Sequence, residues 1–70
     1  MSPALYAFLA SSGPVGVSRA AASRWAQSHG RSPRTVLRAL DRAATRGRVQ
    51  ARLLRARCVV YVLAAEEARA

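Results

Sequence analysis

Residues 32–47 read SPRTVLRALDRAATRG, and this stretch decides the fold of the chain. Ser32 followed by Pro33 is typical of a helix start, and Gly47 preceded by Arg46 is typical of a helix end. An apolar stripe at helical spacing is formed by Val36, Leu37, Leu40 and Ala44. The opposite face carries Arg34, Thr35, Arg38, Asp41, Arg42 and Thr45. The stretch therefore predicts an amphipathic helix over 33–46 with a mainly basic outer face.

Two more helices are predicted on the N-terminal side of this stretch. Ser2 and Pro3 repeat the cap-then-proline signature, and apolar residues follow at helical spacing until Gly13. The apolar residues of this first helix are Leu5, Phe8 and Leu9. Ser18 is placed to cap a second helix over Arg19–Ser28, whose small residues suit close packing against another helix. The chain therefore contains three predicted helices.

Strands are predicted on both sides of the second and third helices. Val15–Val17 is β-prone and long enough for one edge strand of three residues. After the third helix, apolar and polar residues alternate over 49–53, and a second apolar run occupies 58–63. These two segments predict an antiparallel hairpin over 49–62 with a basic tip, and 64–70 forms a short tail.

The charge of the chain is strongly one-sided. All twelve basic residues are arginines, and with three acids the formal net charge is +9. Eleven of the arginines lie between Arg19 and Arg57, where Asp41 is the only acid. A positive field on the folded part predicts a polyanionic partner. A codon bias towards Arg and Ala in a GC-rich genome would explain the same count of arginines.

The order of these elements resembles the winged helix-turn-helix superfamily, and the resemblance covers residues 3–63. Ala26, Gly30 and Val36 match its positions for close helix contact, turn glycine and interhelical core. The resemblance implies an α+β, mainly α fold: three helices of winged helix-turn-helix type with a C-terminal β-hairpin wing. Seventy residues make one domain, since so short a chain cannot bury two cores.

The resemblance also implies how the chain binds DNA. The helix over 33–46 is the recognition helix in the major groove, and the wing lies on the DNA backbone. The DNA-binding residues expected on this helix and at its start are Arg31, Ser32, Arg34, Thr35, Arg38 and Arg42. Those expected on the wing are Arg52, Arg55 and Arg57. Asp41 is expected to form a local ion pair with Arg38 or Arg42, or to accept a hydrogen bond from cytosine.

No catalytic, cofactor or metal site is predicted. One His and one Cys cannot build a metal centre, and His29 has no evident carboxylate partner. Trp25 is expected in the core, and His29 is expected to contact a helix end or water. Cys58 has no disulfide partner in the sequence, and the apolar start follows no basic residue, so we expect a cytoplasmic protein, nucleoid-associated if prokaryotic. No segment is long and apolar enough to span a membrane.

Three functions remain open at this point. The first is double-stranded DNA binding in transcription regulation or DNA architecture, the second is RNA binding, and the third is a protein-interaction module. The 58–63 strand is apolar on both faces, whereas a surface hairpin should alternate, so a homodimer through this strand or through the first helix is also expected.

Overall fold

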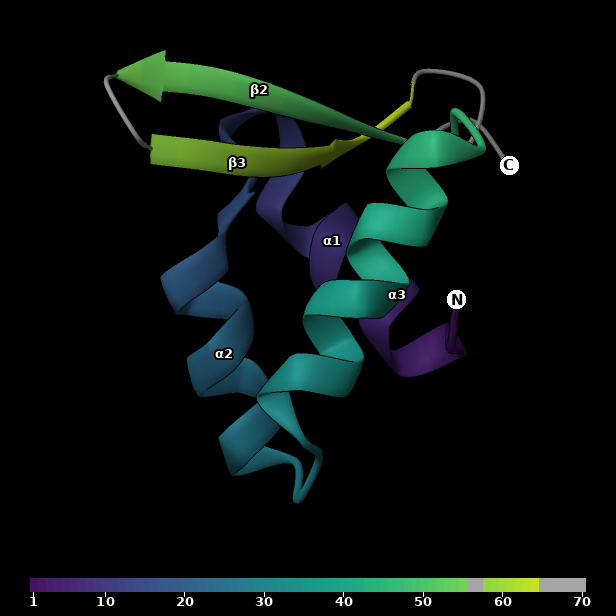
Figure 1. The fold of residues 1–70 in the computed structure, drawn as a ribbon, viewed down its shortest axis with the longest axis vertical. Coiled ribbons are helices and arrows are strands. Elements are labelled where there is room, and N and C mark those ends of the chain that lie inside the picture. The colour runs from purple at the N-terminus through teal and green to yellow at the C-terminus, as the bar shows by residue number, and fades with distance from the viewer. Residues whose placement is uncertain (56–57, 65–70) are drawn as a thin grey trace.

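A computed structural model of the chain describes residues 1–55 and 58–64. Figure 1 shows three helices beneath a small antiparallel sheet. The elements in chain order are α1 (Pro3–Ser12), the 3-10 turn η1 (Gly13–Val15), β1 (Val17–Ser18), α2 (Arg19–Ser28), α3 (Pro33–Thr45), β2 (Val49–Arg55) and β3 (Cys58–Leu63). The predicted fold class is confirmed: the protein is a mainly helical α+β protein with a winged-helix layout, and the β2–β3 hairpin is its C-terminal wing.

Serine side chains start two of the helices. Ser2 Oγ accepts a hydrogen bond from the Leu5 amide at 3.3 Å, and Ser18 Oγ accepts one from the Ala21 amide at 3.1 Å. Each bond satisfies an amide that has no partner inside its helix. Ser32 occupies the same position before α3, but its side chain makes no capping bond. The start of α3 is therefore the one of the three helix starts that is not capped by a serine side chain.

Two glycine turns define the ends of α2 and α3. Gly30 has φ +65° and Gly47 has φ +78°, a conformation that costs glycine little because it has no Cβ. The amides of Gly30 and Arg31 donate to the carbonyls of Gln27 and Ala26. The amides of Gly47 and Arg48 donate in the same pattern to Ala44 and Ala43. Both are Schellman turns, which satisfy the last carbonyls of a helix and redirect the chain.

The sheet has the strand order β1-β3-β2, so β3 is its central strand. Both pairings are antiparallel, and Tyr61 lies opposite Val17 on one side and Ala51 on the other. The prediction of a strand from Val15 is wrong at its start, because Gly13–Val15 form a 3-10 turn and β1 begins at Val17. Pro14 in the first turn and Gly16 at φ +84° produce this bend.

The core lies between the helices and the inner face of the sheet. Its buried residues are Leu5, Leu9, Val17, Ala22, Ala26, Val36, Leu40, Ala43, Val49, Tyr61 and Leu63. Ala22 and Ala26 are fully buried, which allows α2 and α3 to approach closely. Ala26 and Val36 thus occupy the packing positions expected of them. Ala43 belongs to the buried stripe of α3, whereas the predicted Ala44 is only partly buried.

The outer face of β3 is covered within the same chain. Val60 and Val62 are buried on this face, and the backbone of Gly16 packs against both. A Cβ built on Gly16 would lie 2.8 Å from Val62 Cγ2. The apolar character of both faces of β3 therefore needs no second chain to explain it. The homodimer stays a prediction, without the support of this observation.

Candidate nucleic-acid interface

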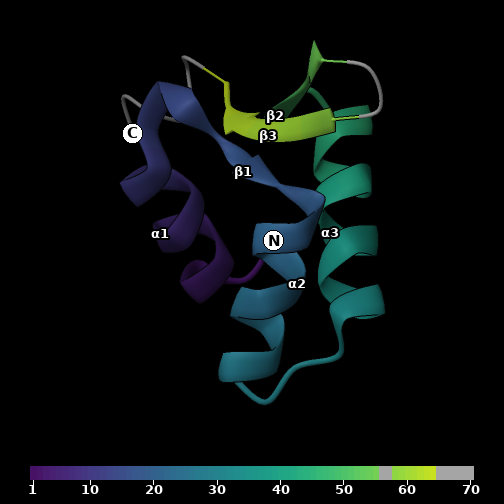
Figure 2. The ribbon, with the colours of Figure 1, turned by 90° about the vertical axis from the view of Figure 1, so that its left-hand side faces the viewer.

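The outer face of α3 is an exposed basic surface. Val36, Leu40 and Ala43 face the core, while the opposite side of the helix is open to solvent. Figure 2 shows α3 at one edge of the molecule, with no helix outside it. The exposed side chains that the structure brings together here are Arg34, Thr35, Arg38 and Arg42. This arrangement agrees with the helix face expected from the sequence.

Asp41 lies on the flank of α3 and is held by other elements. Its carboxylate accepts a hydrogen bond from the Tyr61 hydroxyl at 2.7 Å and forms an ion pair with Arg19 at 3.4 Å. Arg19 also donates to the Tyr61 oxygen. The prediction that Asp41 pairs locally with Arg38 or Arg42 is wrong. Asp41 lies on the side of α3 that faces the start of α2 and β3, where Arg19 and Tyr61 contact it.

This three-residue cluster ties α2, α3 and β3 together. Burial raises the pKa of the Tyr61 hydroxyl above its ordinary value, and the hydrogen bond to Asp41 raises it further. The nearby guanidinium of Arg19 lowers that pKa and only partly offsets the increase. Tyr61 therefore stays a neutral hydrogen-bond donor over the physiological range. Sequence reasoning missed Arg19 and Tyr61, since they lie 22 and 20 positions from Asp41.

The guanidinium groups on the outer face of α3 are not neutralised by Asp41. Arg34, Arg38 and Arg42 form no hydrogen bond, ion pair or ring contact with other residues that the structure describes. Their positive charges are therefore available to an external anion.

At the N-terminal end of α3, Arg31 is held in place by two contacts. It donates to Ser2 Oγ at 2.8 Å, and its guanidinium lies 5.4 Å from the centre of the Trp25 ring. Trp25 is half-buried and stacks on Phe8 at 5.2 Å and on His29 at 4.4 Å. His29 also contacts the Trp25 carbonyl at the end of α2, through Nδ1 at 2.8 Å, as predicted for a helix-end histidine.

The same end of α3 contains a shallow cavity of about 330 Å³ between α1 and α3. Arg31, Ser32 and Thr35 line it, so the structure brings these three expected residues together. The remaining lining residues are Ser2, Leu5, Val36 and Ala39. Exposed amides at the uncapped start of α3 lie beside Arg31 and offer hydrogen bonds to an anion.

Of the three arginines expected on the wing, Arg52 is the one whose side chain the structure describes. Arg52 lies opposite Val60, on the sheet face that points away from the helices, and donates to the Gln50 side chain at 3.0 Å. Arg55 ends β2, but the structure describes its backbone only, and Arg57 lies outside the described residues. Figure 2 shows the Arg55 end of β2 and the start of β3 on the same side of the molecule as α3.

Residues 1–55 and 58–64 contain no cluster of three or more His, Cys, Asp or Glu side chains that could hold a metal ion, and Cys58 is a free, exposed thiol. Within the same ranges no helix has the length and apolar character needed to cross a bilayer.

These features describe a small basic α+β protein with an exposed helix and a hairpin beside it. No protein-family model, curated protein or solved structure matches the chain. Function must therefore be inferred from the chain's own residues.

Proposed function

We propose that the protein binds double-stranded DNA with α3 in the major groove and the β2–β3 hairpin along the DNA backbone, as a transcription regulator or an architectural protein. One observation carries the proposal: the outer face of α3 presents Arg34, Arg38 and Arg42 without a neutralising partner among the described residues. An α-helix fits the width of the major groove, and three aligned guanidinium groups match its negative potential. Such a protein works in the cytoplasm, on the nucleoid in a prokaryote.

Different residues of this surface have different roles in the proposal. Arg34 and Arg38 donate paired hydrogen bonds to guanine, and Thr35 contacts a thymine methyl group or a phosphate. Arg31, Ser32 and the amides at the start of α3 bind a backbone phosphate, which positions the helix without reading sequence. Arg42, one turn beyond Arg38, extends the contact along the groove.

The packing around α3 supports a recognition role, because a helix that reads bases must be held rigidly. The cluster of Arg19, Asp41 and Tyr61 fastens the middle of α3 to α2 and β3. Arg31 is oriented by Ser2 and Trp25 before any partner arrives. Fixing side chains in advance lowers the entropy that binding must remove.

The test is selection of bound duplexes from a random pool, followed by affinity measurements with Arg38→Ala. We expect a loss of about 5- to 150-fold on the preferred site and a loss of preference at one base pair. Arg24→Ala is the matched control, since it removes an equal charge from the exposed face of α2. A loss in Arg38→Ala that is no larger than in the control would remove Arg38 from base readout.

Salt dependence tests the duplex contact as a whole. The logarithm of the affinity should fall with the logarithm of the salt concentration, with a slope of about −0.9 per neutralised phosphate. A shallow slope would contradict the proposal. Preferential binding of a hairpin RNA over a duplex of equal charge would assign the surface to RNA instead.

A further inference from the structure

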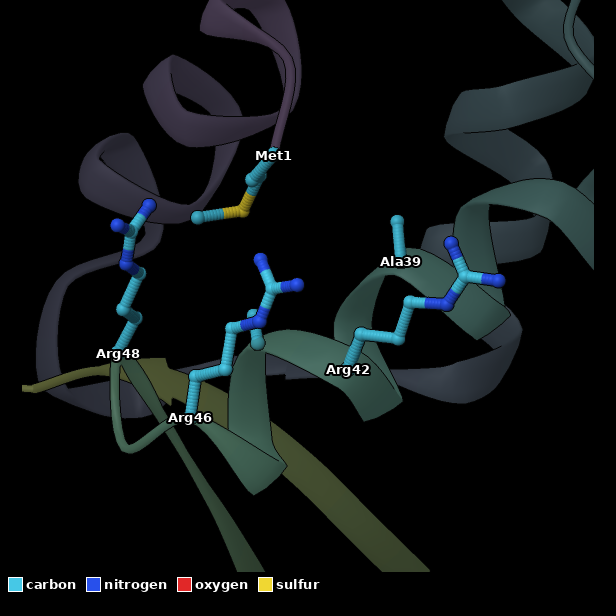
Figure 3. Close-up of a pocket in the computed structure, with 6 residues that line it drawn as sticks. Met1, Ala39, Arg42, Arg46 and Arg48 are labelled. Atoms are coloured by element: carbon cyan, nitrogen blue, oxygen red, sulfur yellow. The ribbon is translucent and has the colours of Figure 1, made fainter.

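A basic hollow lies at the other end of α3, and Arg42 is the one of its lining residues that also belongs to the proposed DNA-binding face. It measures about 150 Å³ and is lined by Met1, Ala39, Arg42, Ala43, Arg46 and Arg48. Three of these six lining residues are arginines, and none is acidic. Figure 3 shows Arg46 and Arg48 extending to the same side as Met1, with Arg42 further along the helix beside Ala39. We call this site the basic hollow.

The Schellman turn at the end of α3 places these side chains. Gly47 adopts φ +78°, so the chain reverses direction there. Arg46, the C-cap residue of α3, lies before the turn, and Arg48, the residue before β2, lies after it. The guanidinium groups of Arg46 and Arg48 consequently lie on either side of the Met1 side chain (Figure 3). Two arginines that are separated by one residue are thereby directed to one site.

Helix capping does not account for the charge at this site. Cations often gather at a helix C-terminus because its last carbonyls lack partners. Here the carbonyls of Arg42, Ala43 and Ala44 already accept the amides of Arg46, Arg48 and Gly47. These three carbonyls need no guanidinium donor, so the arginines are not required as caps.

The charges in the basic hollow also oppose one another. Arg42 and Arg46 are four residues apart on one helix, a spacing at which like charges destabilise the helix. Asp41, the single acid in residues 1–55 and 58–64, is engaged by Arg19 and Tyr61 and does not neutralise Arg42 or Arg46. An anion in the basic hollow would relieve this repulsion.

We propose that the basic hollow binds a phosphoryl group, held mainly by Arg46 and Arg48 with Arg42 at its margin. Planar guanidinium groups donate two parallel hydrogen bonds to phosphate oxygens, which a single ammonium cannot do. The volume is at least about ten times the roughly 10–15 Å³ that one water molecule needs on the same measure, which accommodates one phosphoryl group with residual water. The phosphoryl group belongs either to the DNA backbone, in which case the inference rests on the proposed function, or to a free phosphorylated molecule.

The first experiment uses pyrophosphate as the probe and follows backbone amide NMR signals at constant ionic strength. We expect saturable shifts at Ala43, Arg46, Gly47 and Arg48. They should disappear in the Arg46→Gln/Arg48→Gln double variant and persist in Arg24→Gln, the control from α2. Retention of the shifts in the double variant would overturn the proposal.

The second experiment identifies the source of the phosphoryl group by duplex titrations at several salt concentrations. If the ligand is a backbone phosphate, the double variant should have a salt slope that is shallower by about 0.9 than that of Arg24→Gln. If the ligand is a free molecule, the double variant and Arg24→Gln should have the same salt slope for duplex binding, and the double variant should lose only pyrophosphate binding. Matching slopes together with no saturable pyrophosphate shift in the unmodified protein would overturn the proposal.

These outcomes separate the two proposals. Saturable pyrophosphate binding by a protein that does not bind duplex DNA would refute the proposed function and support the basic hollow as a site for a free ligand. Duplex binding that depends on Arg38 but not on Arg46 or Arg48, without pyrophosphate binding, would refute the hollow alone.

Discussion

The two ends of α3 have the same turn but hold their arginines differently. A glycine at positive φ followed by arginine precedes the helix at Gly30–Arg31 and follows it at Gly47–Arg48. Arg31 contacts Ser2 and Trp25. The guanidinium of Arg46, beside the second turn, makes no hydrogen bond, ion pair or ring contact to the part of the chain that the structure describes.

This difference shows two ways of presenting a cation to a partner. At the first end, contacts with α1 and α2 fix the guanidinium, so binding there removes little side-chain freedom. At the second end, no contact with the described residues holds the guanidinium of Arg46, so its charge is open to a ligand. The first end suits positioning of the helix on a partner, and the second suits capture of a phosphoryl group.

The largest loss of stability is expected from a substitution in the middle of α3, because it weakens the packing that holds both ends of this helix. Leu40 is fully buried in the middle of α3, and Leu40→Ala should lower the free energy of unfolding by about 2–5 kcal/mol. Leu53→Ala is the control, because Leu53 is 69% exposed. Urea unfolding measures both variants. Equal losses would contradict the position of Leu40 in the core.

The glycine turns test whether the two ends are equivalent in the backbone. A Cβ at Gly30 or Gly47 would meet no atom within 4 Å, so alanine introduces strain without a clash. Gly30→Ala and Gly47→Ala should each cost about 1–2 kcal/mol in urea unfolding. Asparagine at the same positions should recover part of the loss, since it tolerates positive φ. A cost at one glycine only would show that the two turns are not equivalent.

The sequence predicted the features that depend on near neighbours in the chain. Caps, proline positions and glycine turns located the helices, and the alternation over 49–53 located the hairpin. The basic face of α3 followed from helical spacing alone. The start of β1 was missed because Gly13–Val15 fold as a 3-10 turn.

The contacts of charged side chains depend on tertiary structure and were harder to predict. The helical spacing suggested a local partner for Asp41, yet Arg19 and Tyr61 reach it from α2 and β3. Arg31 finds Ser2, which is 29 positions away. Such pairs follow from how helices cross, and periodicity in one segment does not encode that.

Tyr61→Phe tests the cluster that fixes α3 between its two ends. Loss of the hydroxyl removes its hydrogen bonds with Asp41 and Arg19 and should lower the free energy of unfolding by about 1 kcal/mol near neutral pH. The loss stays this small because water can replace the hydroxyl at both side chains. The pKa of Tyr61 is raised in the folded protein above the unfolded value of about 10. Its contribution is therefore complete below about pH 10 and is lost as pH rises through the folded pKa.

Urea unfolding of the unmodified protein and of Tyr61→Phe across this range measures the effect. The difference between the two stabilities should shrink above about pH 10. The two proteins differ only at position 61, so the difference between their stabilities reports on the Tyr61 hydroxyl. A difference that grows with pH would show that the folded state favours the phenolate and would contradict burial as the main cause.

The smallest change in the free energy of unfolding is expected when Arg31 and Arg46, the arginines at the two ends of α3, are compared. Arg31→Gln removes the contacts with Ser2 and Trp25 and should cost about 0.5–1 kcal/mol, the usual value of an exposed cation–π contact. Arg46→Gln should change the free energy of unfolding by less than about 0.5 kcal/mol, because lost attraction to the helix end offsets relieved repulsion with Arg42. Urea unfolding without DNA or phosphate gives both values. A cost at Arg46 equal to that at Arg31 would mean that the folded chain itself holds Arg46, and the two ends of α3 would then present their cations in the same way.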